Sequence, residues 1–403
     1  MDWLRRADWL THERVRGYAL LLALASLVLV GVSFWRAMPP GTTDFLAFWG
    51  AGQLTAAGDP AAAYDLAVQQ RVQSATGSSG WFAFVNPPPF LFVVAPLGVL
   101  PLPIAWAAWV ALTWGLWCWV GIRAFPRLWP LVLAYPGALI AAGHAQTGLL
   151  TGALLVLAAH ELPRRQVVAG AAVGALVIKP HLALLAPFWL SAGGKWRAFV
   201  AAGLVVAALL GAAWLIFGSD TMLAYTGSWS ASRQLIERPD PDFMLRMSTI
   251  FSQLRPHLGD FVALAGAACS AVLALAVALF APRRFGDDAS GASAAVLAAT
   301  ALASPYLFSY DLPFLVFPTL GLVIQGLERG FRPYEKLGLT LLYFAPYATR
   351  AAAFARRHLW DAERRVLHRR SRGGQVSIDG YAEDYAFLIN ALVSLHQADL
   401  QHR

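Results

Sequence analysis

Residues 18–35 read YALLLALASLVLVGVSFW, eighteen consecutive residues without a charged side chain. An apolar run of this length is typical of a membrane-spanning helix, because about 20 helical residues cross the hydrocarbon core of a bilayer. The run follows a segment that contains Arg5, Arg6, Arg14 and Arg16. Basic residues mark the cytoplasmic end of a span, so we expect a cytoplasmic N-terminus. No small-residue cleavage site accompanies the run, and it is therefore interpreted as a retained first span.

The composition of the whole chain indicates the same environment. Its 403 residues are 58% hydrophobic and only 13% charged, whereas roughly a quarter of the residues of a soluble domain are charged. The formal net charge of +8 is divided among short clusters between apolar runs, as in cytoplasmic loops. A nucleic-acid partner is not expected, because no basic stripe with interleaved aromatics occurs on a soluble domain. The sequence predicts an all-α polytopic membrane protein.

The apolar stretches are uneven in length, and several are too short to cross a bilayer alone. We expect all basic clusters to be cytoplasmic. The number of crossings places them all on that side if 88–100 is re-entrant and 166–191 is a broken pair of half-helices. Pro and Gly interrupt both stretches, which is tolerated where backbone lines a protein cavity. We expect a bundle of about 9–11 transmembrane helices. Residues 36–87 are expected to form interfacial helices on the outer surface.

Asp44 follows the first span directly, within the run TTDFLAFW at 42–49. A carboxylate at the start of a helix is favoured in its ionised form by the helix dipole. An ionised carboxylate can act as a general base on a sugar hydroxyl. The alternative is that Asp44 merely starts the helix, with Thr43 as its cap. The residues alone favour this structural alternative.

Further polar side chains lie within or beside apolar runs, where each is costly and therefore a candidate site residue. Lys179 would be neutralised by the phosphate of a lipid carrier, or it could instead extend to the headgroups. Asn86 precedes three prolines and could bind a ligand hydroxyl or satisfy nearby backbone. The other candidates for binding donor phosphate or sugar on the predicted outer face are His144, Gln146, His181, Arg233, Tyr310 and Asp311.

Motifs of several other chemistries are missing. The chain contains no glycine-rich phosphate loop, no HExxH, no CxxC and no GxSxG. Cys118 and Cys269 are isolated in apolar stretches and predict neither a metal site nor a disulfide. No cofactor and no metal site is predicted, although one Asp with a donor phosphate could hold Mg²⁺. A transporter or lipid flippase without chemistry is the alternative, and inverted internal repeats, which would favour it, are not recognisable.

An ordered set of short motifs adds a family resemblance. The set comprises Asp44-Phe45, Gly58-Asp59-Pro60, Tyr64-Asp65, Asn86-Pro87-Pro88, Pro96-Leu97, Leu100-Pro101, Gly143 with Gln146, Lys179-Pro180, and Ser304-Pro305-Tyr306 with Tyr310-Asp311-Leu312. In this order, over residues 15–348, the chain resembles glycosyltransferase family 87, the polyprenyl-phosphate-dependent, mannosyltransferase-like group of GT-C membrane enzymes. One departure is that His144 and Ala145 separate Gly143 from Gln146, where the family usually has a closer Gly-Gln pair.

The resemblance implies a GT-C-like bundle with its active site on the outer face. It implies a polyprenyl-phosphate sugar donor, inversion at the anomeric carbon, and an Asp in the first outer loop as the base, to which Asp44 corresponds. We therefore expect transfer of a hexose, mannose above others, to a lipid or glycan acceptor outside a bacterial-type inner membrane. An inactive, truncated transferase is a further alternative.

Residues 351–403 form a different segment, charged at first and then with apolar residues at helical spacing from Tyr381 to Leu395. The stretch around 380–389 resembles part of the α/α-barrel region of spermatogenesis-associated thioredoxin-domain proteins. One or two helices cannot close a barrel or bury a core. We therefore expect residues 1–350 to form the transferase domain and 351–403 to form a short soluble helical tail, a fragment of an unrelated protein.

Overall fold

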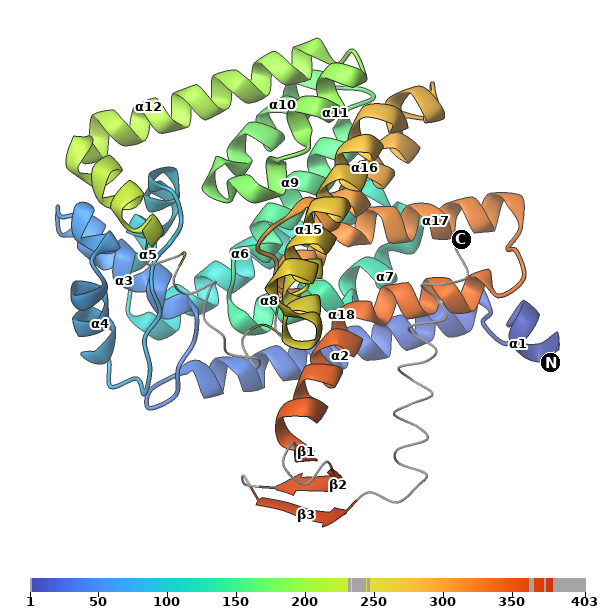
Figure 1. The fold of residues 1–403 in the computed structure, drawn as a ribbon, viewed down its shortest axis with the longest axis horizontal. Coiled ribbons are helices and arrows are strands. Elements are labelled where there is room, and N and C mark those ends of the chain that lie inside the picture. The colour runs from blue at the N-terminus through green and yellow to red at the C-terminus, as the bar shows by residue number, and fades with distance from the viewer. Residues whose placement is uncertain are drawn as a thin grey trace.

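The computed structural model describes residues 2–230, 233, 244, 247–361, 366–372 and 375–379. It is a bundle of helices with one small sheet at its edge (Figure 1). Among the described residues, five helical segments are long and apolar enough to cross a membrane: α2 (His12–Ala37), α6 (Leu102–Ala124), α12 (Trp196–Gly227), α15 (Ile250–Phe285), and Ser309–Arg329, which joins η6 (Ser309–Leu315) to α17 (Val316–Arg329). The predicted all-α polytopic membrane fold is confirmed.

Short helices occupy the segment between α2 and α6. They are α3 (Phe45–Ala56), η1 (Ala61–Tyr64), α4 (Leu66–Ser74), η2 (Pro88–Phe90) and α5 (Leu91–Gly98), and a further short helix, α1 (Asp2–Arg6), precedes α2. The first eight residues of α3 are all buried, so this helix lies within the protein and not on its surface. Helix α5 crosses α3 so closely that a side chain on Gly98 would collide with the backbone of Gly52. Together η2 and α5 extend about 16 Å, too short to cross, which fits the expected re-entrant segment.

The middle of the chain is built from interrupted helices. They are η3 (Pro126–Leu128), α7 (Trp129–Leu133), α8 (Pro136–His144), α9 (Gly148–Glu161), α10 (Gln166–Ala175), η4 (Leu176–Ile178), η5 (Pro180–Ala183) and α11 (Ala186–Ala192). Lys179 separates η4 from η5 in a non-helical conformation, with φ of −151° and ψ of 71°. A residue before proline is disfavoured in the helical region, so Pro180 explains the interruption. The broken pair expected at 166–191 is found here.

The C-terminal part adds α16 (Ala289–Ala303) and α18 (Glu335–His358) to α15 and α17. An antiparallel sheet follows, in the order β1 (Trp360–Asp361), β2 (Val366–Arg372) and β3 (Gln375–Asp379). The predicted helical tail thus begins with the last residues of α18, and strands follow within its described part. The helical spacing that starts at Tyr381 lies outside the described residues.

The basic clusters gather at one end of the bundle, which we call the basic end. Glu161 Oε1 lies 3.3 Å from Arg123 Nε, and its Oε2 lies 3.9 Å from Arg165 Nε. The backbone N–H of Tyr334 donates to the carbonyl of Arg5 at 2.7 Å. These contacts join loops that are far apart in the sequence, as expected if the loops share one side of the membrane.

A second group of contacts extends the basic end. Leu162, Lys195, Pro282 and Gly286 line one pocket, so the loops before α12 and after α15 meet there. Helix α2 starts at this end and runs through its 26 residues, about 39 Å, toward Asp44. The basic end and Asp44 therefore lie at opposite ends of the first span.

Candidate active site

Asp44 stands at the start of α3 without capping it. The residue occupies the N-cap position, but its side chain makes no capping hydrogen bond. Thr43 Oγ1 instead accepts a hydrogen bond from the backbone N–H of Phe45 at 3.3 Å. The side chain of Asp44 is 23% exposed and is thus available to partners other than its own helix.

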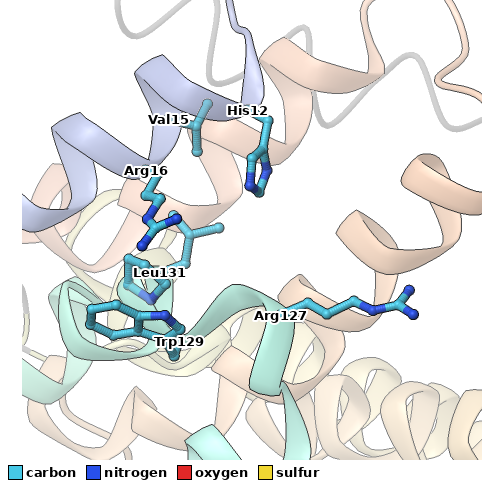
Figure 2. A pocket seen from close by; sticks show the side chains of 7 residues that line it. His12, Val15, Arg16, Arg127, Trp129 and Leu131 are labelled. Atoms are coloured by element: carbon cyan, nitrogen blue, oxygen red, sulfur yellow. The ribbon is translucent and has the colours of Figure 1, made fainter.

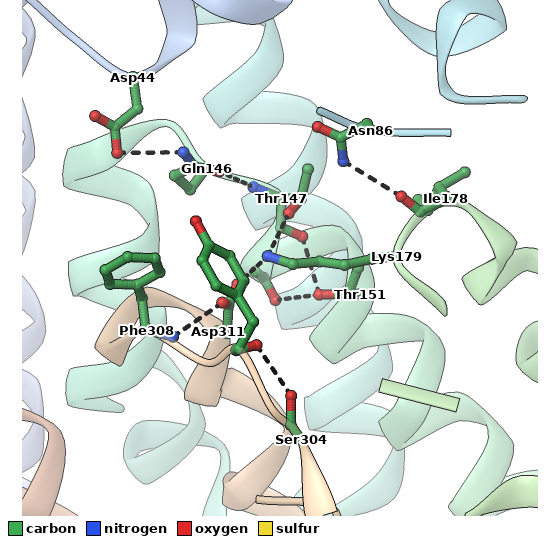
Figure 3. Close-up of polar contacts among 12 residues, drawn as sticks. Asp44, Asn86, Gln146, Thr147, Thr151, Ile178, Lys179, Ser304, Phe308 and Asp311 are labelled. Carbon is green, nitrogen blue, oxygen red and sulfur yellow. Dashed lines mark hydrogen bonds and ion pairs between the residues drawn. The ribbon is translucent and has the colours of Figure 1, made fainter. Parts of the chain in front are cut away.

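Two side chains near the α8–α9 turn approach the same oxygen of Asp44, and Figure 3 shows one of them, Gln146. Gln146 Nε2 donates a hydrogen bond to Asp44 Oδ2 at 3.2 Å. His144 Nδ1 lies 3.8 Å from the same Oδ2. No hydrogen bond from the described part of the chain reaches Asp44 Oδ1. One carboxylate oxygen is therefore held, and the other is free to accept a proton.

The backbone between His144 and Gln146 is fixed by a tryptophan. Ala145 adopts the left-handed conformation with φ of 48°, which is unfavourable for a residue with a Cβ. Trp109 Nε1 donates to the carbonyl oxygen of Ala145 at 2.9 Å in a buried contact. His144 and Ala145, which separate Gly143 from Gln146, therefore lie in a constrained turn, and Gln146 reaches Asp44.

Lys179 and Asp311 form a buried ion pair (Figure 3). Their side chains are 10% and 0% exposed, and Lys179 Nζ donates to Asp311 Oδ1. Lys179 Nζ also donates to Thr147 Oγ1 at 3.2 Å and lies 5.7 Å from the centre of the Tyr310 ring. Asp311 Oδ2 accepts from the backbone N–H of Phe308 at 3.1 Å. Burial of two charges is tolerated because each has a charged partner and further hydrogen bonds.

Aromatic rings connect the two groups of polar residues. The rings of His144 and Tyr310 are 5.6 Å apart, and Tyr310 stacks on Phe308 at 5.0 Å. Tyr306 meets His181 at 6.0 Å in an edge arrangement. His181 Nε2 is buried and has no hydrogen-bond partner among the described residues. A buried polar atom of this kind calls for a water molecule or a ligand.

Tyr306 is a neutral phenol in this environment. Burial, and then the negative charges of Asp311 and Asp44, raise the pKa of its hydroxyl above the usual value. Because the charged form is disfavoured by both causes, the hydroxyl keeps its proton and can donate a hydrogen bond. Tyr306 belongs to a motif that carries the family resemblance, whereas the sequence predicted no role for Thr147.

Two predicted site residues have other surroundings. Asn86 Nδ2 donates to the carbonyl of Ile178 at 3.3 Å, and the Asn86 carbonyl accepts from Tyr64 at 3.0 Å. Asn86 thus satisfies nearby backbone, one of its two expected roles, and ties the polar loop to the broken pair. Arg233 is exposed. Only Arg233 and Met244 are described between 231 and 246, so the geometry does not place Arg233 beside Asp44.

Metal-binding clusters are absent from the described residues. No group of three or more His, Cys, Asp or Glu is close enough to hold an ion there. The chemistry that the side chains offer is a partly exposed carboxylate with one free oxygen, held in place by an amide. Such a group can accept a proton from a hydroxyl within hydrogen-bond reach.

Comparison with known families identifies the family of the chain. The family model of glycosyltransferase family 87 matches residues 84–305, more than half of the chain. The chain belongs to glycosyltransferase family 87. No curated protein and no solved structure matches it significantly. The residues matched to family 87 include Gln146 and Lys179, whereas Asp44 and Asp311 lie outside them. Family 87 membership and the spanning helices identify a multi-pass membrane glycosyltransferase.

Proposed function

We propose that the chain transfers a hexose, mannose above others, from a polyprenyl-phosphate donor to a lipid or glycan acceptor, with inversion. The observation that carries this proposal is how the carboxylate of Asp44 is held. Its Oδ2 is held by Gln146 at 3.2 Å, and its side chain takes no part in capping α3. A carboxylate that is held in position, and that makes no hydrogen bond to its own helix, suits a general base.

The proposed reaction has one displacement step. The acceptor hydroxyl gives its proton to Asp44 Oδ1 as its oxygen attacks the anomeric carbon. The bond from that carbon to the phosphate oxygen breaks on the opposite face, and the lipid phosphate leaves with the electron pair. Gln146 keeps the carboxylate in one orientation, which matters because catalysis is sensitive to small misplacements of reacting groups.

The leaving phosphate needs a nearby positive charge or hydrogen-bond donors. Lys179 is the buried candidate, and its present partner is Asp311. Binding of a phosphate there requires Lys179 to be shared between the two anions. His181 Nε2, which is buried without a partner, is a second candidate donor. Two apolar residues after His181 would face the lipid tail. They are Leu184 and Phe188, and they are 47% and 43% exposed.

We place the reaction at the extracytoplasmic face of a bacterial-type inner membrane, with a cytoplasmic N-terminus. The support is the gathering of the basic loops at the end of α2 remote from Asp44. Basic loops remain on the cytoplasmic side during insertion, so the opposite end, with Asp44, lies outside. Membership of a glycosyltransferase family weighs against a transporter or flippase without chemistry.

The test uses membranes that contain the full chain, a lipid extract, and polyprenyl-phosphate donors labelled in mannose, glucose or galactose. The proposal expects label to move from the mannose donor to a new product, and to do so far more slowly with Asp44→Ala. Equal transfer by both proteins removes Asp44 from the mechanism. Transfer only from the glucose or the galactose donor would show that the transferred sugar is not mannose. Transfer from none of the three donors would favour an inactive chain.

A further inference from the structure

A second polar pocket lies at the basic end, far from Asp44. It is formed between the first turns of α2 and the segment that joins α6 to α7, and it is shown in Figure 2. Its lining residues are His12, Val15, Arg16, Arg127, Trp129, Pro130 and Leu131. No carboxylate lines the pocket. Because 26 residues of α2 separate it from the Asp44 end, it cannot be part of the transfer site.

The positive charges of the pocket are not neutralised within the described structure. Arg16 lies over the ring of Trp129, 6.0 Å from its centre, a favourable arrangement for a cation and an aromatic face. Neither Arg16 nor Arg127 forms an ion pair with a described residue. Arg16, Arg127 and His12 are all exposed. Arg16 therefore presents a guanidinium beside the Trp129 ring, a group that suits phosphate oxygens, and Arg127 adds a second positive charge to the lining without a competing internal anion.

An apolar surface continues from the pocket along α2. Leu20, Leu24 and Leu27 follow Arg16 at helical spacing and are 39%, 62% and 56% exposed. Only 17% of the most apolar part of α2 is buried inside the protein. A cationic headgroup pocket and an adjoining lipid-facing stripe together match an amphiphile, whereas a free anion would use the pocket alone.

We propose that this pocket binds the phosphate of an anionic phospholipid, with the acyl chains lying along the Leu20 side of α2. Trp129 sits at the level of the headgroups, where tryptophan is favoured. Basic pockets between spans at one face of a membrane protein are suited to anionic headgroups. The site binds structural lipid of the leaflet at the basic end, and it is separate from the sugar donor.

The test compares phosphatidylglycerol and phosphatidylcholine bound to the purified full chain, measured by native mass spectrometry. The pocket variant is Arg16→Gln/Arg127→Gln. The charge-matched control is Arg14→Gln/Arg284→Gln, because both of these arginines are at the basic end but outside the pocket. Two lost basic residues near a membrane surface correspond to roughly 30-fold weaker binding. We expect that loss for phosphatidylglycerol in the pocket variant and less than about a threefold loss in the control.

Equal losses in the two variants would overturn the proposal, because binding would then depend on total charge alone. Displacement of the lipid by inorganic phosphate would also overturn it in favour of a free-anion site. Arg16→Lys/Arg127→Lys guards against misfolding, since it keeps both charges. This variant should retain most of the binding, and complete loss in it would contradict the headgroup assignment.

Discussion

Gln146 donates its side-chain amide to Oδ2 of Asp44 across 102 positions of sequence. The contact joins the turn before α9 to the start of α3. It orients the carboxylate and leaves Oδ1 without a hydrogen bond from the described residues. The orientation of the proposed base thus depends on one amide, and this dependence can be tested directly.

Gln146→Ala should lower the transfer rate roughly 10- to 100-fold with little change in KM, because a misplaced catalytic group can cost about 100-fold. Gln146→Glu should be worse, since a second carboxylate repels Asp44. The measurement is steady-state transfer in membranes. Gln325→Ala serves as the control, because Gln325 is an exposed residue of α17. A fall in rate with that control equal to the fall with Gln146→Ala would contradict the positioning role.

The Lys179–Asp311 pair should be essential for stability as a pair. Removal of one partner from a buried ion pair costs about 3–5 kcal/mol, so Lys179→Met and Asp311→Asn should each strongly lower the unfolding temperature in detergent. The double variant Lys179→Met/Asp311→Asn should lose less than the two single losses together, because the two residues are in contact.

An exposed pair supplies the comparison for that cycle. Arg255 Nε lies 2.7 Å from Asp260 Oδ1, and the Asp260 side chain is 68% exposed. Exposed pairs contribute about 0–1 kcal/mol, so Asp260→Asn should have little effect. Additive losses at Lys179 and Asp311 would show that the two residues do not stabilise the fold through each other.

Gly148 is predicted to tolerate no side chain. A Cβ at this first residue of α9 would collide with the carbonyl oxygen of Tyr310, and backbone cannot move aside as a flexible side chain can. Gly148→Ala should cost about 1–3 kcal/mol and reduce transfer by displacing the Tyr310–Asp311 segment. Gly203→Ala is the matched control, because nothing lies within 4 Å of a Cβ there. Normal stability and activity of Gly148→Ala would contradict the close contact between α9 and η6.

Tyr306 should remain protonated at alkaline pH. Burial first, and then Asp311 and Asp44, raise the pKa of its hydroxyl above the usual value, which is about 10. The neutral form therefore persists where an exposed tyrosine has begun to ionise. A tyrosinate absorbance titration of the wild type minus that of Tyr306→Phe should show no ionisation near pH 10. A full step in that difference at this pH would mean that Tyr306 is not buried as described.

The helical fold and the family could be predicted from the sequence, because both depend on the length of apolar runs and on the order of motifs along the chain. Apolar length identified α2 and α6, and the order of short motifs pointed to family 87, which the family match confirms. The break at Lys179 could also be predicted, since Pro180 restricts the residue before it. These inferences needed no knowledge of which side chains touch.

The contacts between side chains at the site were harder to predict from the sequence. Lys179 and Asp311 were each expected near the outer face, but 132 positions separate them, and sequence spacing does not show which charge meets which. Asn86 had two open roles, and the carbonyl of Ile178 that it binds becomes available only because η4 ends there. The burial of α3 depended on the close crossing at Gly52 and Gly98. The strands at 366–372 and 375–379 had no counterpart in the sequence prediction, whose helical pattern at residues 381–395 lies outside the described residues.

The role of Asp44 as the base is tested by measuring donor binding and sugar transfer in one purified full-length preparation of Asp44→Asn. Asparagine keeps the shape of the side chain but cannot take up a proton, and loss of a general base typically costs about 100- to 10,000-fold in rate. We predict that loss of transfer, with binding of polyprenyl-phospho-mannose unchanged within about threefold. Transfer by Asp44→Asn at the wild-type rate would contradict the assignment of Asp44 as the base of this membrane glycosyltransferase.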